Sequence, residues 1–206
     1  MAFTGWPTAA LEFYEGLEAD NSKAYWTSHK TVYQEQVLRP MEELLEDLVP
    51  EFGPSKIFRP YRDIRFSNDK TPYKTHIGAT LGGTGYVQFS ADGLSAGTGM
   101  WHLEPDELVK YRAAVAGPDG AELAAIVAAL EQAGVEVHGH GSLKSAPRGY
   151  PSDHPRIGLL RHKGLTTWRH WNPSPELSTP AAAGKVVELF RTSAAFCDWL
   201  GSHIDR

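Results

Sequence analysis

The chain has 206 residues, of which 41% are hydrophobic and 22% are charged. These values are ordinary for a globular protein and exclude a disordered or fibrous chain. The length suits one hydrophobic core, so a single domain over residues 1–206 is expected. The apolar runs are too short for a membrane span, and no basic start precedes an apolar stretch, so neither membrane contact nor secretion is expected. Cys197 is the single cysteine, which fits a reducing cytoplasm.

The charge is unevenly distributed along the chain. A net charge of −5 and a pI near 6.0 argue against coating nucleic acid by bulk attraction. Residues 56–76 carry +4 and residues 144–171 carry +5, so the remainder carries −14. If the two basic segments meet in space, they form a focused positive site. Alternatively, their cations neutralise acidic helices.

The N-terminal quarter has helical periodicity. Residues 3–18 predict a lead-in and a first helix, and Asn21 is a candidate N-cap for a long second helix. Trp26 and Tyr33 lie on its apolar stripe and are expected in the core. Pro40 should kink this helix or divide it into two.

After residue 54 the pattern changes to alternation, which predicts strands over residues 57–66, 73–81, 86–90 and 94–100. In the first of these, Phe58, Ile64 and Phe66 share one face. Residues 82–85 and Asp92-Gly93 are turns, so the four strands form an antiparallel meander. The alternating Gly97 and Gly99 permit close packing or the close approach of a ligand.

The rest of the chain is mainly helical. Helices are predicted from Pro105 to residue 115 and from Asp119 to residue 133, followed by a short strand at residues 135–138. Asp153 is expected to cap a short helix, residues 165–171 to form a strand, and Pro180 to start a helical region recapped at Ser193. The chain is therefore predicted to be an α+β domain, with an antiparallel sheet of at least four strands between N- and C-terminal helices.

The most distinctive stretch runs from Arg59 to His76. It reads R-x-x-R-D-x-R-F-x-x-x-K-x-P-Y-K-x-H. In this stretch the sequence resembles the DUF2461 family, whose hallmark has the same form except for Asn at the last position. Residues 21–26, 143–150 and 154–156 also resemble that family. The resemblance implies important positions but no activity, because the function of the family is unknown.

Physical chemistry suggests an anion site within this motif. Arg59, Asp63 and Arg65 would share one strand face, so the carboxylate could hold both guanidinium groups. Lys70 lies in the following turn, and Lys74 and His76 project from the next strand. Together these cations could surround a phosphate or carboxylate. A salt-bridge lattice that pins the hairpin is the structural alternative, although it leaves surplus cations to be buried.

The second basic segment offers similar groups. Arg148, His154 and Arg156 come from a Gly/Pro-rich loop, and Arg161 and Lys163 follow them. A loop of this kind often completes a pocket on a sheet. Alternatively, these cations lie on a solvated helix face.

Signatures of other chemistry are absent from the sequence. There is no phosphate-binding loop, dinucleotide fingerprint or nucleophile elbow, and no cofactor is predicted. His138 and His140 would share a strand face, but without a fuller ligand pattern no metal site is expected. Cys197 is expected to be a buried, inert thiol.

Three hypotheses follow from these patterns. The first is a protein with enzyme-like architecture that binds a small phosphorylated or carboxylated molecule, and it is the one favoured. Its expected ligand contacts are Arg59, Arg62, Arg65, Lys70, Lys74, Arg148 and Arg156, and its candidates for catalysis are Asp63, Tyr73, His76 and His154. The second is a nucleotide or nucleic-acid module, and the third is an interaction protein with a purely structural motif. The sequence assigns no reaction, pathway or oligomeric state.

Overall fold

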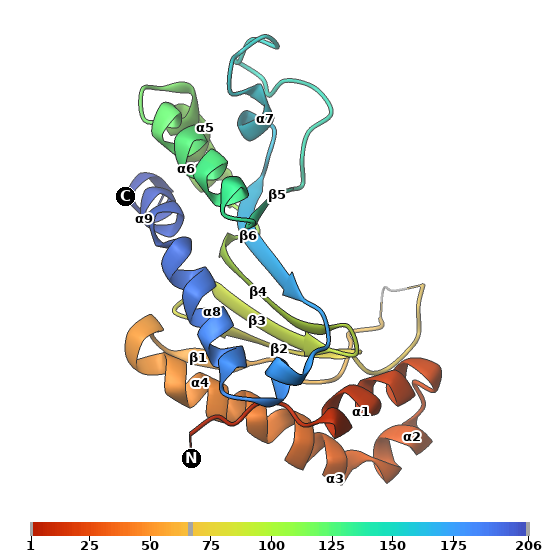
Figure 1. Cartoon of the computed structure of the whole chain (residues 1–206). Coiled ribbons are helices and arrows are strands. Elements are labelled where there is room, and N and C mark those ends of the chain that lie inside the picture. The colour runs from red at the N-terminus through yellow and green to blue at the C-terminus, as the bar shows by residue number, and fades with distance from the viewer. Residues whose placement is uncertain (1, 66–67, 205–206) are drawn as a thin grey trace. The chain divides into compact units, whose positions relative to one another are not determined.

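The alternating segments in the middle of the chain build an antiparallel sheet, shown in Figure 1. The computed structural model describes residues 2–65 and 68–204. Within these residues there are six strands, in the order β1-β2-β3-β4-β6-β5. They are β1 (Ser55–Ile57), β2 (His76–Leu81), β3 (Gly85–Ser90), β4 (Gly93–Met100), β5 (Glu136–His140) and β6 (Gly164–Trp171). The predicted α+β class and the meander of β1 to β4 are confirmed.

The chain divides into two compact units, and the boundaries fall inside β4 and β6. Unit 1 contains Met1–Ala96 and His170–Glu188, and unit 2 contains Gly97–Arg169 and Leu189–Arg206. The helices of unit 1 are α1 (Thr8–Ala19), α2 (Lys23–Ser28), α3 (Lys30–Val32), the π-helix η1 (Tyr33–Leu38), α4 (Arg39–Phe52) and the 3₁₀ helix η2 (Pro175–Ser178). Those of unit 2 are α5 (Pro105–Ala116), α6 (Gly120–Gln132), α7 (Ile157–Leu160) and α9 (Ala194–Ile204), while α8 (Ala181–Thr192) spans the last boundary.

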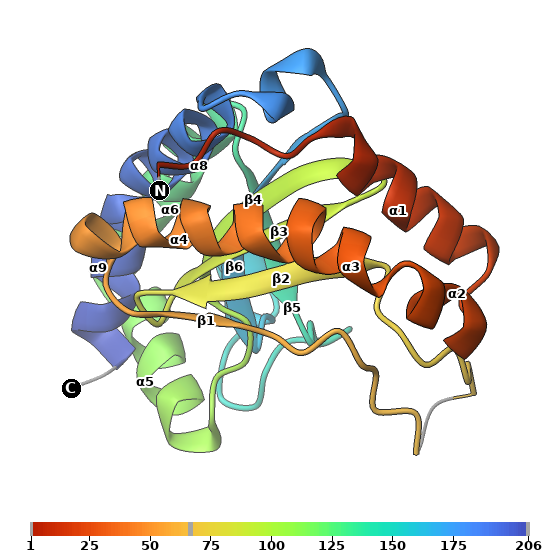
Figure 2. The same cartoon turned by 90° about the horizontal axis from the view of Figure 1, so that it is seen from below.

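The core of unit 1 lies between the sheet and its N-terminal helices. Figure 2 shows α4 lying over β2 and α1 lying near one end of β3. Met41 and Leu44 of α4 are buried, as are Ile77 and Phe89 of the strands. The Trp6 ring stacks on Phe89 with centroids 4.5 Å apart. Burial of these apolar side chains supplies the main driving force for the unit, and it leaves the opposite face of β2 and β3 for polar residues.

Pro40 is accommodated inside the long helical region by a change of helix type. The preceding turn is the π-helix η1, and the Arg39 N–H donates to the carbonyl of Gln34, five residues earlier. Widening the helix here relieves the clash between the proline ring and the preceding turn. The sequence predicts a kink or a division at Pro40, and the structure shows no division there, because the π-helix η1 continues directly into α4. Trp26 and Tyr33 are each 6% exposed, which confirms their place in the core.

The two glycines of β4 allow close packing within unit 2. A Cβ at Gly97 would lie 2.2 Å from the carbonyl oxygen of Thr167, and one at Gly99 would lie 2.5 Å from that of Leu165 and 3.0 Å from the Phe196 ring. Backbone approach to β6 therefore accounts for both glycines, as the packing interpretation expects.

The helices of unit 2 follow the predicted pattern with one exception. Pro105 occupies the first turn of α5, Asp119 precedes α6, and Ser193 separates α8 from α9. The short helix predicted after Asp153 is wrong at its start, because α7 begins at Ile157. Pro155 disfavours the helical conformation at His154, which delays the helix. Cys197 is half-buried in α9. No single helix in the described residues is long and apolar enough to cross a membrane, although the bent pair α5 and α6 passes a test of combined length and composition.

Candidate functional site: an extended hairpin and the adjoining sheet face

The motif segment forms an irregular hairpin beyond β1 and β2. Tyr61 and Tyr73 form an isolated bridge, and the Lys74 N–H donates to the carbonyl of Pro60 at 2.8 Å. The predicted strand over residues 57–66 is therefore wrong beyond Ile57. Pro60 has no N–H to donate to a ladder. In addition, Ile57 pairs with Ala79, and Tyr61 pairs with Tyr73. The two pairs are four residues apart on one strand of the hairpin and six residues apart on the other, so the register between the strands shifts. Phe66 and Ser67 lie outside the described residues.

The tip of the hairpin is held by its own charged groups. The Arg62 guanidinium donates to Asp69 and to Thr71, and the Thr71 N–H donates to Asp69 Oδ1 at 2.9 Å. Lys70 Nζ donates to the carbonyl of Ile64 at 3.0 Å. The Arg62 hydrogen bond lowers the pKa of Asp69 to about 2, with help from Thr71. Two expected ligand contacts, Arg62 and Lys70, thus make bonds within the tip.

Asp63 holds one arginine by hydrogen bonds instead of the expected two. Its carboxylate accepts two hydrogen bonds from the Arg65 guanidinium, at 2.9 Å from Nε and 2.7 Å from Nη2, and a third from the Arg65 backbone N–H at 3.3 Å. These bonds, and to a smaller degree the charge of Arg59, lower the pKa of Asp63. The expected pairing of Asp63 with both arginines is therefore corrected: Arg59 acts on Asp63 through its charge alone, because the strand alternation that would align all three ends at Ile57.

The base of the hairpin is anchored to α2 and the loop before it. The Tyr73 ring is 6% exposed and stacks on Trp26, with centroids 4.4 Å apart and planes 8° apart. The Asn21 side chain makes two hydrogen bonds to the Tyr73 backbone: its Oδ1 accepts from the Tyr73 N–H at 3.0 Å, and its Nδ2 donates to the Tyr73 carbonyl at 3.1 Å. Burial raises the pKa of the Tyr73 hydroxyl. Tyr73 thus positions the backbone next to Lys74, while a role for it in proton transfer stays a prediction.

Lys74 and His76 lie beyond this anchor on the sheet face that α1 and α4 leave uncovered. Ile77 and Ala79 are buried toward the helices, so the alternating His76 and Thr80 point the other way. Lys74 Nζ lies 5.3 Å from the centroid of the Phe58 ring. Burial and the charge of Arg59 lower the pKa of Lys74. Burial and the charge of Lys74 in turn lower the pKa of His76. Arg59, Lys74 and the protonated form of His76 are therefore electrostatic neighbours of like sign, and we call these three residues the cationic cluster.

Sequence reasoning missed the residues beside this cluster. Tyr86 and Gln88 alternate with the buried Val87 and Phe89 of β3, so they share the face of His76. The Tyr86 hydroxyl donates to Gln88 Oε1 at 3.1 Å. The alternation itself was visible in the sequence, and assigning the outward face of β3 would have identified both.

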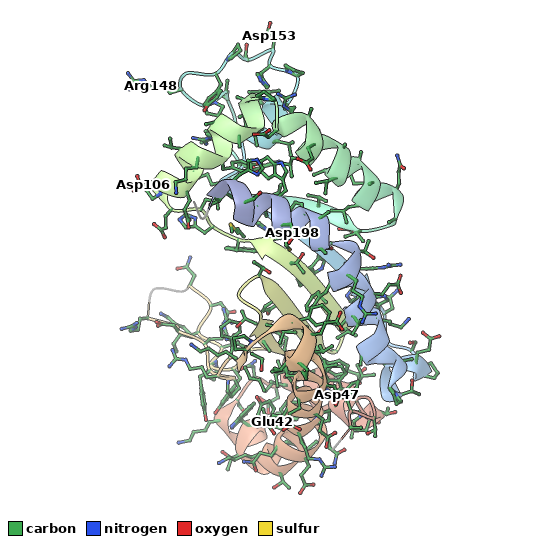
Figure 3. All side chains as sticks on the ribbon, turned by 90° about the vertical axis from the view of Figure 1, so that its left-hand side faces the viewer. Glu42, Asp47, Asp106, Arg148, Asp153 and Asp198 are labelled. Carbon is green, nitrogen blue, oxygen red and sulfur yellow. The ribbon has the colours of Figure 1, made fainter. Side chains whose placement is uncertain are left out.

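The second basic segment belongs to unit 2, and most of its described contacts are structural. The Arg156 guanidinium donates to the carbonyls of Val115, Ala116 and Gly117 at the end of α5. These bonds satisfy groups that a helix end leaves open. His154 Nδ1 accepts from the Arg156 N–H at 3.0 Å. Figure 3 shows Arg148 projecting from its loop. Convergence of the two basic segments stays a prediction, as does ligand binding by Arg148 and Arg156.

The paired histidines of β5 have polar partners of their own. His138 Nε2 lies 2.7 Å from Glu136 Oε2, and His140 Nε2 lies 2.7 Å from Thr166 Oγ1. In the part of the chain that the structure describes, no group of three or more histidine, cysteine or acidic side chains is placed to hold a metal ion.

Two surface hollows lie away from the cationic cluster and have acidic rims. One, of about 570 Å³, lies in unit 1 between α4 and β1 and includes Glu42 and Glu46. The other, of about 330 Å³, lies in unit 2 and includes Glu122 and Asp198. Carboxylates repel an anion, so neither hollow matches the ligand that the motif suggests.

The fold and the hairpin define a class of α+β protein in which an arginine-rich hairpin extends from an antiparallel sheet and adjoins a polar, half-buried face of that sheet. The chain belongs to the DUF2461 family, described as a conserved hypothetical protein, whose model matches residues 9–199. Among solved structures, a conserved hypothetical protein from Pyrococcus furiosus is similar, with 14% identity and a TM-score of 0.37 over 82% of this chain and 98% of the other. Curated protein sequences contain no match to the chain.

Proposed function

We propose that unit 1 binds a small phosphorylated or carboxylated molecule at the cationic cluster of Arg59, Lys74 and His76. One observation carries this proposal. Among the described residues, neither Arg59 nor Lys74 has a carboxylate within ion-pair distance, and the positive charge of Arg59 lowers the pKa of Lys74. Arg62, Arg65 and Lys70, in contrast, make bonds within the hairpin tip.

The energetics of the cluster favour an anion. Neighbouring cations repel each other, and partial burial weakens the hydration of Lys74. A bound anion reverses both effects, because it accepts charge-assisted hydrogen bonds from Lys74 and Arg59. The ligand should be small, since the remainder of the chain carries −14 and repels a long polyanion.

His76 is the best placed of the four candidates for proton transfer. Its lowered pKa leaves the imidazole neutral near pH 7, so it can accept a proton from a ligand held by Lys74. Asp63, by comparison, is paired with Arg65. We propose ligand binding as the function of the site, and proton transfer by His76 if the protein also catalyses a reaction. We propose the cytoplasm as the compartment of the protein.

A nucleic-acid module is the second candidate, and one observation favours it. The cluster borders an exposed ring, Phe58, on an open sheet face, and such rings stack on single-stranded bases. The structural alternative draws support from the bonds of the hairpin tip and from the contact of Lys74 Nζ with the Phe58 ring, but it does not explain the position of the Arg59 charge beside Lys74.

Melting temperatures in a phosphate titration test the proposal. Phosphate should raise the melting temperature of the wild-type protein by ligand linkage, and Lys74→Met should lose this rise. Phosphate also stabilises proteins generally by exclusion from their surface, so the comparison requires a matched control. Lys30→Met removes the same charge from an exposed position on α3 and should respond like the wild type.

Equal responses of Lys74→Met and Lys30→Met would overturn the proposal. A single-stranded oligonucleotide that binds more tightly than phosphate, with strong salt dependence, would instead support the nucleic-acid candidate.

A further inference from the structure

We infer that the ligand of the cationic cluster carries a planar ring bonded directly to its anionic group, as in an aryl phosphate or an aromatic carboxylate. This inference rests on the proposed function and names the substrate class of the same site. Its basis is an aromatic surface, formed by Phe58 and Tyr86, that adjoins Lys74.

Phe58 is exposed although it is large and apolar. Its side chain is 36% exposed, and its N–H donates to the carbonyl of Gly78 at 2.9 Å, which fixes its backbone to β2. The ring centroids of Phe58 and Tyr86 are 6.3 Å apart, with planes inclined by 36°. The two rings therefore form a continuous apolar surface on an otherwise polar face, and such a surface favours a flat ligand.

Tyr86 is held in place by its neighbours. A Cβ at Gly78 would lie 2.5 Å from the Tyr86 hydroxyl and 3.1 Å from Cζ, so the ring rests on the bare backbone of β2. Its hydroxyl hydrogen bond to Gln88 Oε1 adds a second restraint. The Gln88 amide N–H groups have no partner among the described residues and remain donors for a polar atom on the ring of the ligand.

The spacing between charge and ring determines the shape of the ligand. Lys74 Nζ lies over the Phe58 ring, 5.3 Å from its centroid, so an anion held by this ammonium lies close to the aromatic surface. A ring attached directly to that anion is held close to Phe58. A ring on a long linker can lie away from Phe58 and gains no fixed contact with it. Stacking then adds to the charge-assisted bonds of the cluster.

The test compares matched ligands with and without a ring, by calorimetric titration at one pH and ionic strength. Phenyl phosphate should bind about tenfold or more tightly than glycerol phosphate, which is the factor expected for one stacking contact. Benzoate and acetate form the corresponding carboxylate pair, and comparison of the two pairs identifies the anionic group.

Two ring variants locate the contact. Phe58→Leu should remove the preference for phenyl phosphate but retain binding of inorganic phosphate, which Arg59 and Lys74 hold. Tyr61→Leu is the matched control, because Tyr61 is also exposed, at 49%, but lies against Trp26 and Tyr73. It should keep the preference.

Each contrary outcome has a distinct meaning. Binding of phosphate without any preference for aryl ligands would overturn this inference and leave the proposed function standing. Failure of every anion to bind would overturn both. A preference that survives Phe58→Leu would also overturn the inference, because the ring would then be recognised elsewhere.

Discussion

Replacement of Trp26 by alanine is expected to lower the free energy of unfolding by about 3–5 kcal/mol, the range for a buried aromatic side chain. Trp26 is 6% exposed, and its ring contacts those of Tyr73, Tyr33 and Phe13 at centroid distances of 4.4, 4.8 and 5.9 Å. The substitution therefore opens a cavity where the helices meet the base of the hairpin.

Urea denaturation followed by circular dichroism measures this loss. Trp101→Ala is the matched control: Trp101 is 71% exposed, so its removal should cost less than about 1 kcal/mol. A loss for Trp26→Ala no larger than that for Trp101→Ala would contradict the anchoring role of Trp26.

Asn21→Ala is expected to cost about 2 kcal/mol, or about 1 kcal/mol for each of its two hydrogen bonds to the Tyr73 backbone. Hydrogen exchange at the Tyr73 N–H should accelerate, because that donor loses its partner. Ser22→Ala removes the adjacent helix cap, in which the Tyr25 N–H donates to Ser22 Oγ, and should cost about 1 kcal/mol.

The two variants should also differ in where exchange accelerates. Ser22→Ala should expose the Tyr25 N–H and leave that of Tyr73 protected. Identical exchange patterns would show that Asn21 acts only on the helix and would remove the long-range anchor.

Local patterns in the sequence predicted β2 to β6 and the starts of several helices, but not the extent of β1. The alternation of Val87 and Phe89 identified β3, and Pro105 and Ser193 marked helix starts, because these signals depend on a few adjacent residues. Asn21 shows the limit of such reasoning. It was predicted to cap the second helix, but Ser22 caps it and Asn21 bonds to a residue 52 positions away. No local pattern encodes a partner at that distance.

The candidate site was predicted in part. The motif predicts the basic hairpin, but regular alternation through Pro60 would place Arg59 and Arg65 on one face with Asp63. The observed division, with Arg62 and Lys70 bonded within the tip and Lys74 beside the open face, depends on the register slip between Ile57 and Tyr73. A slip of this kind arises from tertiary packing, such as that of Tyr73 on Trp26.

The pH dependence of stability follows from the same cluster. The pKa of His76 lies below its ordinary value of 6.5 in the folded chain, because of burial and then the charge of Lys74. The unfolded chain therefore binds more protons just below pH 6.5, so this residue lowers stability as pH falls through that window. An anion bound at the cluster should raise the pKa of His76 and reduce the loss.

Titration of the His76 imidazole by NMR, with and without saturating sulfate, is the most direct measurement of anion binding at the cluster. Sulfate keeps a constant charge over the pH range of the titration. The predicted result is a pKa for His76 that rises with sulfate in the wild type and responds much less in Lys74→Met. His140 and His162 of unit 2, whose pKa values are also lowered, chiefly by burial, should not respond. A His76 pKa that is the same with and without sulfate would contradict anion binding at Arg59, Lys74 and His76.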